Sequence, residues 1–354
     1  MRITSFDEYL VGCRFCPMCA PFGEVSNVTK DEAHSTRVRG MLLWQIANQK
    51  ASWSEETSDL IYQSTLDSIS QAWCINHYPV PEYILSARAD IVDAGLAPYP
   101  VKQLGRKINP DFTTQLENPA TTDAKIVFYP GDSIAGENLF AAKAALKFLS
   151  LAGIKASLPK ILIDCGGLAY SLGRQVLAGE SAKEVNASLG SGGTILVDGP
   201  LTYWMLTKVY PKLGTPLPSE VKVFLLLDYL LERYDQGELD LPGKSLRVYT
   251  LGSEYSRLTE AGYTSFRRLL EAIPGIKVIE PYDGLELAHA SGVGGGLHLV
   301  HPDLSAAVSK QRIEEALKAN AEWVICDSPL DAAHLKQFAG EDISIGTLPE
   351  ILYQ

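Results

Sequence analysis

The 354-residue sequence lacks a dense run of lysine and arginine, a secretory leader and a long hydrophobic stretch. Lys and Arg total 31 against 42 Asp and Glu, a formal net charge of −11, so no surface suited to nucleic-acid phosphates is predicted. Residues 1–9 include carboxylates and no apolar core, which is unlike a signal peptide. No segment approaches the roughly 20 apolar residues of a membrane-spanning helix. We therefore expect no nucleic-acid partner, no transmembrane segment and a cytoplasmic location.

Cysteine is scarce, with six in the whole chain, which does not suit the disulfide framework of a small secreted domain. Three of the six lie within seven residues, in Cys13-Arg14-Phe15-Cys16-Pro17-Met18-Cys19. This C-x2-C-x2-C spacing lets three thiolates surround one face of an iron–sulfur cubane, which needs a fourth ligand.

The fourth ligand is predicted from the paired runs of two-cluster ferredoxins, in which the last cysteine of each C-x2-C-x2-C-x3-C run binds the other cluster. Here the fourth place of the first run is Gly23. Counting back from Cys74 at the same spacing reaches Ser70, Asp67 and Ser64. These four positions together correspond to one abandoned cluster.

The remaining set is complete, and we predict one [4Fe–4S] cluster with four ligands: Cys13, Cys16, Cys19 and Cys74. A zinc site and three unliganded thiols are the alternatives, although zinc usually takes two paired C-x2-C knuckles. Arg37 and Arg39 follow the cysteine run, where positive charge would favour a reduced cluster. They could equally form a solvated helix start.

The sequence pattern changes along the chain and predicts four segments. They are a helical N-terminal domain (1–105), a Pro/Asn-rich linker (106–123) and two α/β domains (124–240 and 241–354). The first block shows helical stretches at Arg37–Gln49 and Thr57–Trp73 and no strand alternation. Later, short β-rich runs alternate with helical segments, which favours parallel sheets.

The alternation in the first α/β domain predicts strands and helices at Lys125–Tyr129, Gly136–Ala152, Lys160–Ile163, Ser171–Leu189, Thr194–Val197 and Tyr203–Leu213. In the second it predicts Leu246–Thr250, Tyr263–Ile273, Lys277–Ile279, Pro302–Asn320 and Trp323–Ile325. The residues after corresponding strands also match: Gly131-Asp132-Ser133 with Gly252-Ser253-Glu254, and Val197-Asp198-Gly199-Pro200 with Cys326-Asp327-Ser328-Pro329. We infer an internal duplication.

The cysteine segments, together with Ser35-Thr36-Arg37-Val38-Arg39-Gly40 and Cys74-Ile75-Asn76-His77-Tyr78-Pro79-Val80-Pro81, resemble the iron–sulfur subunits of glycolate oxidase and lactate-utilisation complexes. The heterodisulfide reductase B subunit and the anaerobic glycerol-3-phosphate dehydrogenase C subunit belong to the same wider group. The resemblance implies a helical ferredoxin-like domain followed by two cysteine-rich domains, each with Cys-Cys-Gly and Cys-Pro-x-Cys motifs.

The C-terminal half departs from that family pattern. The Cys-Cys-Gly places read Asp164-Cys165-Gly166 and Ala290-Ser291-Gly292, and the Cys-Pro-x-Cys places read Gly199-Pro200-Leu201-Thr202 and Ser328-Pro329-Leu330-Asp331. The additional metal and disulfide chemistry of the family is therefore not expected here. Cys165 and Cys326 are predicted to be ordinary buried thiols, and Gly292–Gly296 a glycine-rich turn rather than a nucleotide loop.

A single cluster moves one electron at a time, so its natural partner is a flavin that takes two electrons from an organic substrate. We expect this chain to be a non-catalytic electron-transfer subunit beside an FAD-dependent dehydrogenase, with FAD in the partner subunit and a further electron carrier beyond. By resemblance, the partner's substrate is a 2-hydroxy acid or similar alcohol. A scaffold and relay role in a heterodisulfide-reductase-like complex is the alternative, and catalysis by Asp132, Asp164 and Asp198 is a weaker third.

Overall fold

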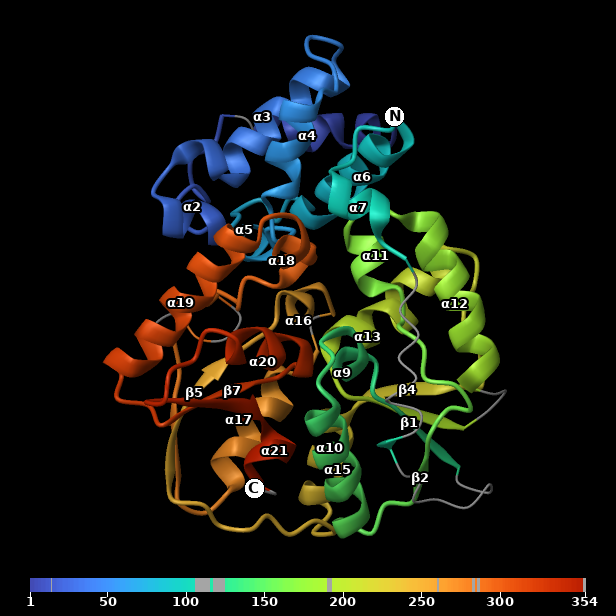
Figure 1. Cartoon of the computed structure of the whole chain (residues 1–354), viewed down its shortest axis with the longest axis vertical. Coiled ribbons are helices and arrows are strands. Elements are labelled where there is room, and N and C mark those ends of the chain that lie inside the picture. The colour runs from blue at the N-terminus through green and yellow to red at the C-terminus, as the bar shows by residue number, and fades with distance from the viewer. Residues whose placement is uncertain are drawn as a thin grey trace.

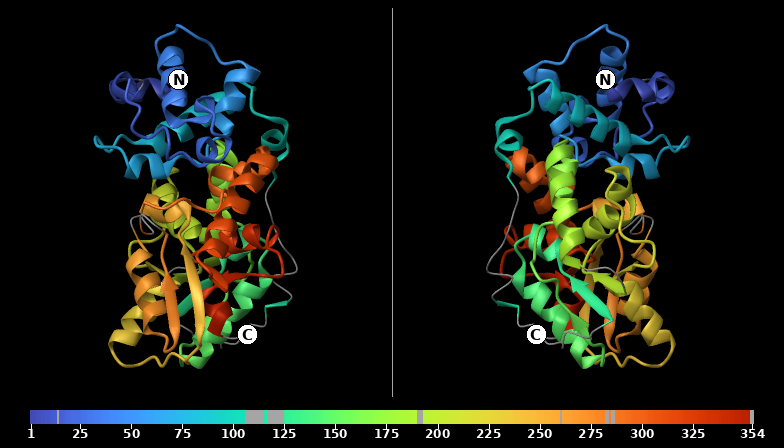
Figure 2. Two further views of the ribbon diagram at one scale, coloured as in Figure 1. Left: turned by 90° about the vertical axis from the view of Figure 1, so that its left-hand side faces the viewer. Right: turned by 90° about the vertical axis from the view of Figure 1, so that its right-hand side faces the viewer.

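The computed structural model describes residues 1–13, 15–105, 115–116, 125–189, 193–259, 261–281, 284 and 287–352. A helical region made by the first hundred residues lies at one end of the molecule, and two α/β units lie side by side beneath it (Figure 1). The side views show the same arrangement, with the N-terminus in the helical region (Figure 2). The prediction of a helical region followed by α/β structure with parallel sheets is confirmed at this level.

The helical region has no strand among its described residues. Its elements are η1 (Arg2–Phe6), α1 (Asp7–Cys13), α2 (Glu24–Thr29), η2 (Glu32–His34), α3 (Thr36–Ala47), α4 (Glu55–Tyr62), α5 (Ser68–Ala72), α6 (Val80–Asp93) and α7 (Tyr99–Gln103). The Ser35 hydroxyl caps α3 by accepting from the Val38 amide, and Ser54 and Thr57 form a capping box on α4. Such side-chain acceptors replace the carbonyls that the first turn of a helix lacks.

The predicted continuous helix over Thr57–Trp73 is wrong, because the chain turns between α4 and α5. Leu66 and Asp67 have φ values of 81° and 55°, left-handed conformations that a right-handed helix cannot include. The Ser64 hydroxyl accepts from the Leu66 amide at 3.0 Å and so supports the turn. One position of the abandoned cluster thus builds local structure.

The first α/β unit contains one parallel sheet in the order β2-β1-β3-β4. Its strands are β1 (Ile126–Tyr129), β2 (Ala156–Ser157), β3 (Thr194–Val197) and β4 (Lys222–Leu225). Its helical segments are α9 (Gly131–Ala135), α10 (Leu139–Leu151), α11 (Gly167–Ser171), α12 (Gln175–Leu189), α13 (Pro200–Trp204), the π-turn η3 (Met205–Val209), α14 (Tyr210–Lys212) and α15 (Leu226–Asp235). Phe128 pairs with Leu196, and Leu196 with Phe224.

Two sequence predictions in this unit are wrong. Lys160–Ile163 is not a strand; the strand at that edge of the sheet is β2, which ends before Pro159. A proline cannot donate to the ladder, so the pairing stops there. The helix predicted over Ser171–Leu189 is divided into α11 and α12 at Gly173, whose φ of 84° breaks helical geometry.

The second α/β unit repeats the strand order, β6-β5-β7-β8, again all parallel. Its strands are β5 (Leu246–Leu251), β6 (Ile276–Ile279), β7 (Trp323–Cys326) and β8 (Ser344–Thr347). Its helical segments are α16 (Glu254–Thr259), α17 (Tyr263–Ala272), η4 (Gly294–Gly296), α18 (Leu297–Val300), α19 (Pro302–Lys318), α20 (Pro329–Lys336) and α21 (Leu348–Leu352). Sequence reasoning missed the short strands β4 and β8.

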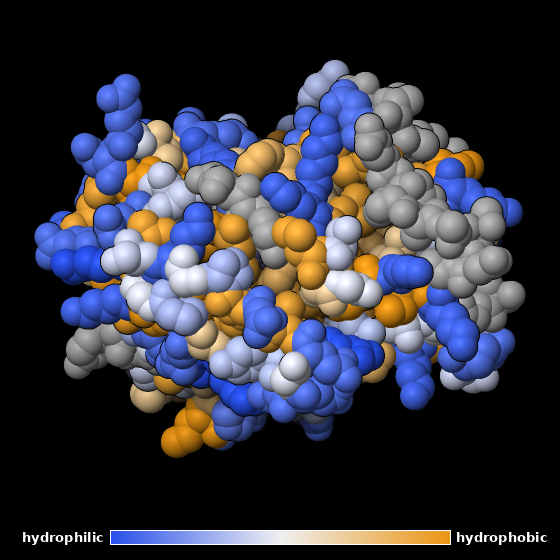
Figure 3. All heavy atoms as spheres, turned by 90° about the horizontal axis from the view of Figure 1, so that it is seen from below, coloured by the Kyte–Doolittle hydropathy of each residue, from blue (hydrophilic) through white to orange (hydrophobic). Residues whose placement is uncertain are grey.

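The two α/β units pack on each other through α10 and α21. On the face opposite the helical region, hydrophobic atoms gather near the middle and hydrophilic side chains around the rim (Figure 3). The Asn138 amide also donates to the Pro329 carbonyl across the two units at 3.3 Å. The two units have the same order of strands. That they are copies of one duplicated domain stays a prediction.

Arg88 on α6 joins the helical region to both α/β units. Its guanidinium is fully buried and donates to the carbonyls of Ile61, Ser64, Ser171 and Gly295. Burial lowers its pKa to about 10, which leaves it charged at neutral pH. Four carbonyl dipoles compensate the buried charge of Arg88. Separating the units would remove some of these acceptors and would therefore cost free energy.

The glycine-rich turn provides the surface on which the helical region sits. A Cβ at Gly294 would lie 2.9 Å from the Thr65 carbonyl oxygen, and one at Gly295 would lie 3.0 Å from the Thr65 carbonyl carbon. Gly295 also has a φ of 60°. Glycine is required here because two backbones meet with no room for a side chain.

The predicted linker 106–123 lies outside the described residues except for 115–116. The domain boundaries at 105, 124 and 241 stay predictions, as does the ferredoxin-like character of the helical region. Of the helices in the described part of the chain, none combines the length and the apolar character needed to cross a bilayer.

Candidate metal centre

The four predicted ligands line one cavity in the helical region. Cys13 ends α1, Cys16 and Cys19 lie in the turns that follow it, and Cys74 lies between α5 and α6. All four line a single cavity together with Met18, Ser70, Ile75, Asn76, Tyr78 and Val80. The fold thus brings Cys74 to a three-cysteine run that is 55 residues away in the sequence.

Two residues that sequence reasoning did not single out fit closely around Cys13. The Tyr83 hydroxyl on α6 lies 3.4 Å from Cys13 Sγ, and Tyr83 is fully buried. Gly40 on α3 faces the same sulfur, since a Cβ there would lie 2.9 Å from Cys13 Sγ. Gly40 lies in the segment that carries the family resemblance, whereas no sequence signal marks Tyr83.

Aromatic side chains hold the two cysteine segments against each other. Phe22, which follows Cys19, stacks on Trp73 with ring centroids 4.1 Å apart and planes 1° from parallel. Tyr78 packs edge-on against Tyr9 of α1 at 5.6 Å. The Trp73 indole also donates to the Leu287 carbonyl of the second α/β unit. Cys74 is therefore flanked on both sides by residues fixed to other elements.

Cys13 and Cys19 are in an environment that disfavours a free thiolate. Burial raises the pKa of Cys13, and it raises the pKa of Cys19 to about 12, with the other thiols and Asp67 adding to both effects. Four thiolates in one cavity would repel each other, so their ionisation at neutral pH requires a bound cationic group. Such a donor set fits an iron–sulfur cluster, whose irons compensate the thiolate charge.

Nowhere in the described ranges do three or more His, Cys, Asp or Glu side chains converge in a geometry that could hold a metal ion. A single zinc ion needs its sulfur ligands at about 2.3 Å from one point. In a cubane each cysteine binds a different iron, so the sulfurs surround a volume instead. The common cavity is the feature that the cysteines share.

Three of the four positions predicted to correspond to an abandoned cluster hold side chains that form hydrogen bonds or an ion pair. The Ser70 hydroxyl lies 2.7 Å from that of Thr36, and a Cβ at Gly23 would lie 3.7 Å from the same Thr36 oxygen. Asp67 forms a buried ion pair with Arg39 at 3.3 Å. The positions from the two sequence segments are thus linked by protein atoms.

Arg39 is not part of a solvated helix start, which corrects that expectation. Its side chain is 1% exposed, and besides Asp67 it donates to the carbonyls of His34, Leu60 and Gln63. Arg37, in contrast, pairs with the exposed Glu32. A buried arginine with four acceptors is satisfied in place.

Asp132, Asp164 and Asp198 follow strands of the first sheet or lie beside them, and all three are buried. Asp132 accepts from the Thr202 amide and hydroxyl at 2.8 and 2.7 Å, and Asp198 from the amides of Asp132 and Ser133 at 3.0 Å each. Asp164 accepts from the Gly166 amide. Burial raises the pKa of Asp132 to about 6 and that of Asp198 to about 7. These bonds support turns between strands and helices.

Asp327 occupies the corresponding place in the second sheet. It accepts from the Ser253 amide at 2.8 Å and from the Ser256 hydroxyl at 2.6 Å, and burial raises its pKa to about 7. Asp198 and Asp327, matched in the sequence, therefore bind the turn after a neighbouring strand in the same way.

The places where the resembling family has later cysteines hold hydroxyls and carboxylates. Thr202 and Ser328 both donate to Asp132, and Ser291 donates to Asp331. Cys165 and Cys326 are buried, at 0% and 1% exposure, and burial raises the pKa of both thiols. Their predicted burial is confirmed.

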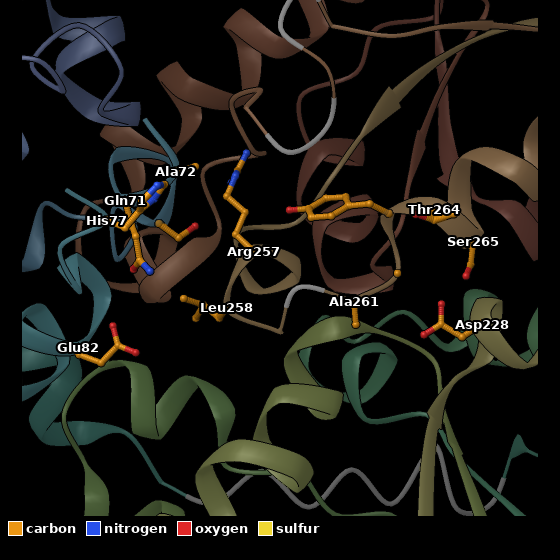
Figure 4. Close-up of a pocket in the computed structure, with 13 residues that line it drawn as sticks. Gln71, Ala72, His77, Glu82, Asp228, Arg257, Leu258, Ala261, Thr264 and Ser265 are labelled. Atoms are coloured by element: carbon orange, nitrogen blue, oxygen red, sulfur yellow. The ribbon is translucent and has the colours of Figure 1, made fainter. Parts of the chain in front are cut away.

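A larger cavity of about 770 Å³ lies behind the Cys74 segment. Gln71, Ala72, His77 and Glu82 lie on one side, and Asp228, Thr264 and Ser265 on the other, with Arg257 and Leu258 between (Figure 4). Its volume is in the range of small-molecule sites. The lining includes one cationic residue, Arg257, and two acidic residues, Glu82 and Asp228. Such a lining suits a polar occupant rather than an apolar one.

Comparison with known proteins finds distant relatives. The D subunit of dihydromethanophenazine:CoB--CoM heterodisulfide reductase from Methanosarcina acetivorans is 25% identical over 289 residues, 76% of this chain and 70% of that protein. The corresponding protein of Methanosarcina barkeri is 25% identical over 288 residues. An uncharacterized iron–sulfur protein of Methanocaldococcus jannaschii is 24% identical over 264 residues, 74% of this chain and 49% of that protein. The chain is thus a distant homologue of iron–sulfur proteins.

No family model matches the chain. Among solved structures, a putative Asp/Glu racemase from Yersinia pestis is similar over 64% of this chain and 94% of its own, with 13% identity and a TM-score of 0.29. A likeness this weak supports no inference about fold or function.

Replacing Gly40 with alanine tests the close fit of α3 against Cys13. Alanine normally stabilises a helix interior by about 1 kcal/mol relative to glycine, but here the new methyl would displace Cys13 Sγ. We expect Gly40→Ala to keep its helix content by circular dichroism and to lose most of its bound iron. Gly179→Ala on α12, where a Cβ meets nothing within 4 Å, is the control. Full iron content in Gly40→Ala would contradict this account.

Replacing Asp327 with asparagine tests the buried carboxyl. Its pKa of about 7 exceeds the roughly 3.9 of an unfolded aspartate, so the folded state binds the proton more tightly. The stability from this proton is full below pH 4 and is lost as the pH rises through 7. Asparagine keeps both hydrogen bonds, because the Ser256 hydroxyl can accept instead of donate.

We therefore expect Asp327→Asn to raise the free energy of unfolding at pH 8, by no more than about 4 kcal/mol at 1.4 kcal/mol per pKa unit, and to flatten its decline between pH 5 and 8. Anaerobic denaturant titrations at several pH values measure this. The exposed Asp342→Asn is the control. An unchanged pH dependence would show that Asp327 is ionised in the folded chain without cost.

Proposed function

We propose that this chain is an iron–sulfur electron-transfer subunit that carries one [4Fe–4S] cluster. The observation that carries the proposal is the common cavity of four thiols: Cys13, Cys16, Cys19 and Cys74. The distant homology to iron–sulfur proteins supports the same cofactor class. When bound, the cluster would supply a centre that accepts and releases single electrons.

The chain's own residues would hold and shield that centre. Four thiolates bind the irons, and Val80 and Tyr78 line the cavity on the protein side. The Tyr83 hydroxyl is placed to donate to Cys13 Sγ, because a thiolate can only accept. A donor to a ligand sulfur stabilises the more negative, reduced state and so raises the reduction potential.

We further propose that the electrons come from an FAD-dependent dehydrogenase and pass to another carrier, or flow in reverse. A flavin takes two electrons from an organic substrate and releases them singly, which matches a single-cluster relay. The family resemblance supports a 2-hydroxy acid or a similar alcohol as the substrate of that partner. The substrate chemistry then belongs to the partner.

A scaffold and relay role in a heterodisulfide-reductase-like complex is the second candidate, favoured by the heterodisulfide reductase subunits among the relatives. The partner distinguishes the two. A flavin dehydrogenase isolated with the chain supports the first, and a set of heterodisulfide-reductase-like subunits supports the second.

Analysis of iron and sulfide tests the ligand set. We expect the anaerobically purified chain to hold about four iron and four sulfide ions, and Cys74→Ala to lose most of both because one corner of the cubane is no longer held. Cys326→Ala, which removes a buried thiol of the second sheet, is the control and should retain them. A normal cluster absorption spectrum in Cys74→Ala would rule out Cys74 as a ligand.

Replacing Tyr83 with phenylalanine tests the hydrogen bond to Cys13. We expect the variant to keep its iron and to show a more negative reduction potential in an anaerobic redox titration followed by electron paramagnetic resonance. Tyr129→Phe also removes a buried hydroxyl bond, to the Ile163 carbonyl in the first α/β unit, and should leave the potential unchanged. Equal potentials for Tyr83→Phe and the unmodified chain would contradict the assignment.

A further inference from the structure

Three exposed apolar residues lie next to the cysteines in the sequence, and two of them line the cysteine cavity. Phe15 is 71% exposed, Met18 53% and Ile75 74%. Phe15 and Met18 stand between successive cysteines of the run, and Ile75 follows Cys74 directly. Met18 and Ile75 also line the cavity itself. We name these three residues the apolar rim.

The other sides of the cavity are closed by buried residues. Ser70 on α5 and Tyr83 on α6 are fully buried, as is Leu43 one turn beyond Gly40 on α3. Cys13 itself is only 7% exposed. A partner's redox centre can therefore approach the four sulfurs most closely over the rim.

The rim is also the place where the negative charge of the chain is interrupted. The chain has 42 Asp and Glu, yet residues 13–23 and 74–81 contain none, and Arg14 and His77 are their basic residues. An apolar surface without carboxylates favours an apolar partner surface and gives an association that depends little on salt. Large apolar side chains left in water at one spot are typical of a protein–protein contact.

We propose that the apolar rim of Phe15, Met18 and Ile75 is the docking surface for the flavin-containing partner protein, which meets it with an uncharged apolar surface around its own redox centre. The inference rests on the proposed function, because it takes the flavoprotein as the occupant. It adds the place of contact and the kind of force that holds the two proteins together.

The rim is distinct from isolated apolar residues elsewhere on the surface. Val176 on α12 is 80% exposed and Leu151 at the end of α10 is 63% exposed, but neither lies near a cysteine in the sequence. These residues provide matched controls, since changing each to serine removes a comparable exposed apolar side chain. None of the three rim residues is a proposed ligand.

The experiment uses the full-length chain with its cluster, affinity-tagged in its native host and isolated anaerobically, with flavin and iron measured in each preparation. The flavoprotein obtained with the unmodified chain is then purified and used as the probe in binding measurements. Phe15→Ser, at the rim residue that does not line the cavity, should keep its iron and bind the flavoprotein at least tenfold more weakly, the loss typical of a central interface residue. Val176→Ser and Leu151→Ser should bind the flavoprotein normally. The unmodified complex should persist in 0.5 M salt, where charge pairs are screened, since the Debye length is already about 10 Å at 0.1 M.

Unchanged affinity in Phe15→Ser, or an equal loss in Val176→Ser, would overturn the docking surface while leaving the flavoprotein partnership intact. Dissociation in salt would also overturn it, since it would indicate a contact made by charges. If the unmodified chain brings down no flavoprotein, the proposed function fails and the docking proposal falls with it. Failure of the docking surface would appear only in the variants or in high salt. Failure of the proposed function would appear in the unmodified chain, so the two failures are distinguishable.

Discussion

The fully buried guanidinium of Arg88 is the interaction on which the rest of the structure depends. It binds carbonyls of the helical region and of both α/β units at once. The same helix, α6, places Tyr83 against Cys13 and holds the N-terminal segment, since Asp90 accepts from the amides of Arg2 and Ile3. One helix therefore fixes both the thiol cavity and the arrangement of the three parts. Buried charge makes this junction specific, because any displacement leaves the cation without its acceptors.

Hydrogen bonds and an ion pair occupy positions where cysteines are predicted to have been lost, both in the abandoned ferredoxin-type run and in the cysteine-rich motifs of the resembling family. Asp67 pairs with Arg39, Ser70 with Thr36, and Ser291 with Asp331. Each of these side chains is polar, buried and partnered, so the chain is stabilised there by its own atoms.

The sequence predicted the helical and α/β regions, the strands β1, β3, β5, β6 and β7, and helices such as α3, α10 and α19, because periodicity reports local structure. It did not predict α6, α15 or α20. It failed at Leu66 and Asp67, where left-handed backbone divides a helix that periodicity reads as continuous. It also missed β4 and β8, since four-residue strands carry little periodic signal. At the site, cysteine spacing predicted four ligands that share one cavity, and their role as ligands stays a prediction. Nothing in the sequence marked Tyr83, because a buried tyrosine looks the same in sequence whatever it contacts.

By itself, the sequence determined the identity and the spacing of the four cysteines, and the lack of acidic residues in the segments 13–23 and 74–81 that carry them. These are properties of short stretches of chain. Only the tertiary structure decided that Cys74 shares a cavity with Cys13, Cys16 and Cys19, that Arg39 is buried beside Asp67, and that Met18 and Ile75 remain exposed. The physical reason is that burial and contact depend on how distant segments pack, and here that packing is set by α6 and the glycine-rich turn.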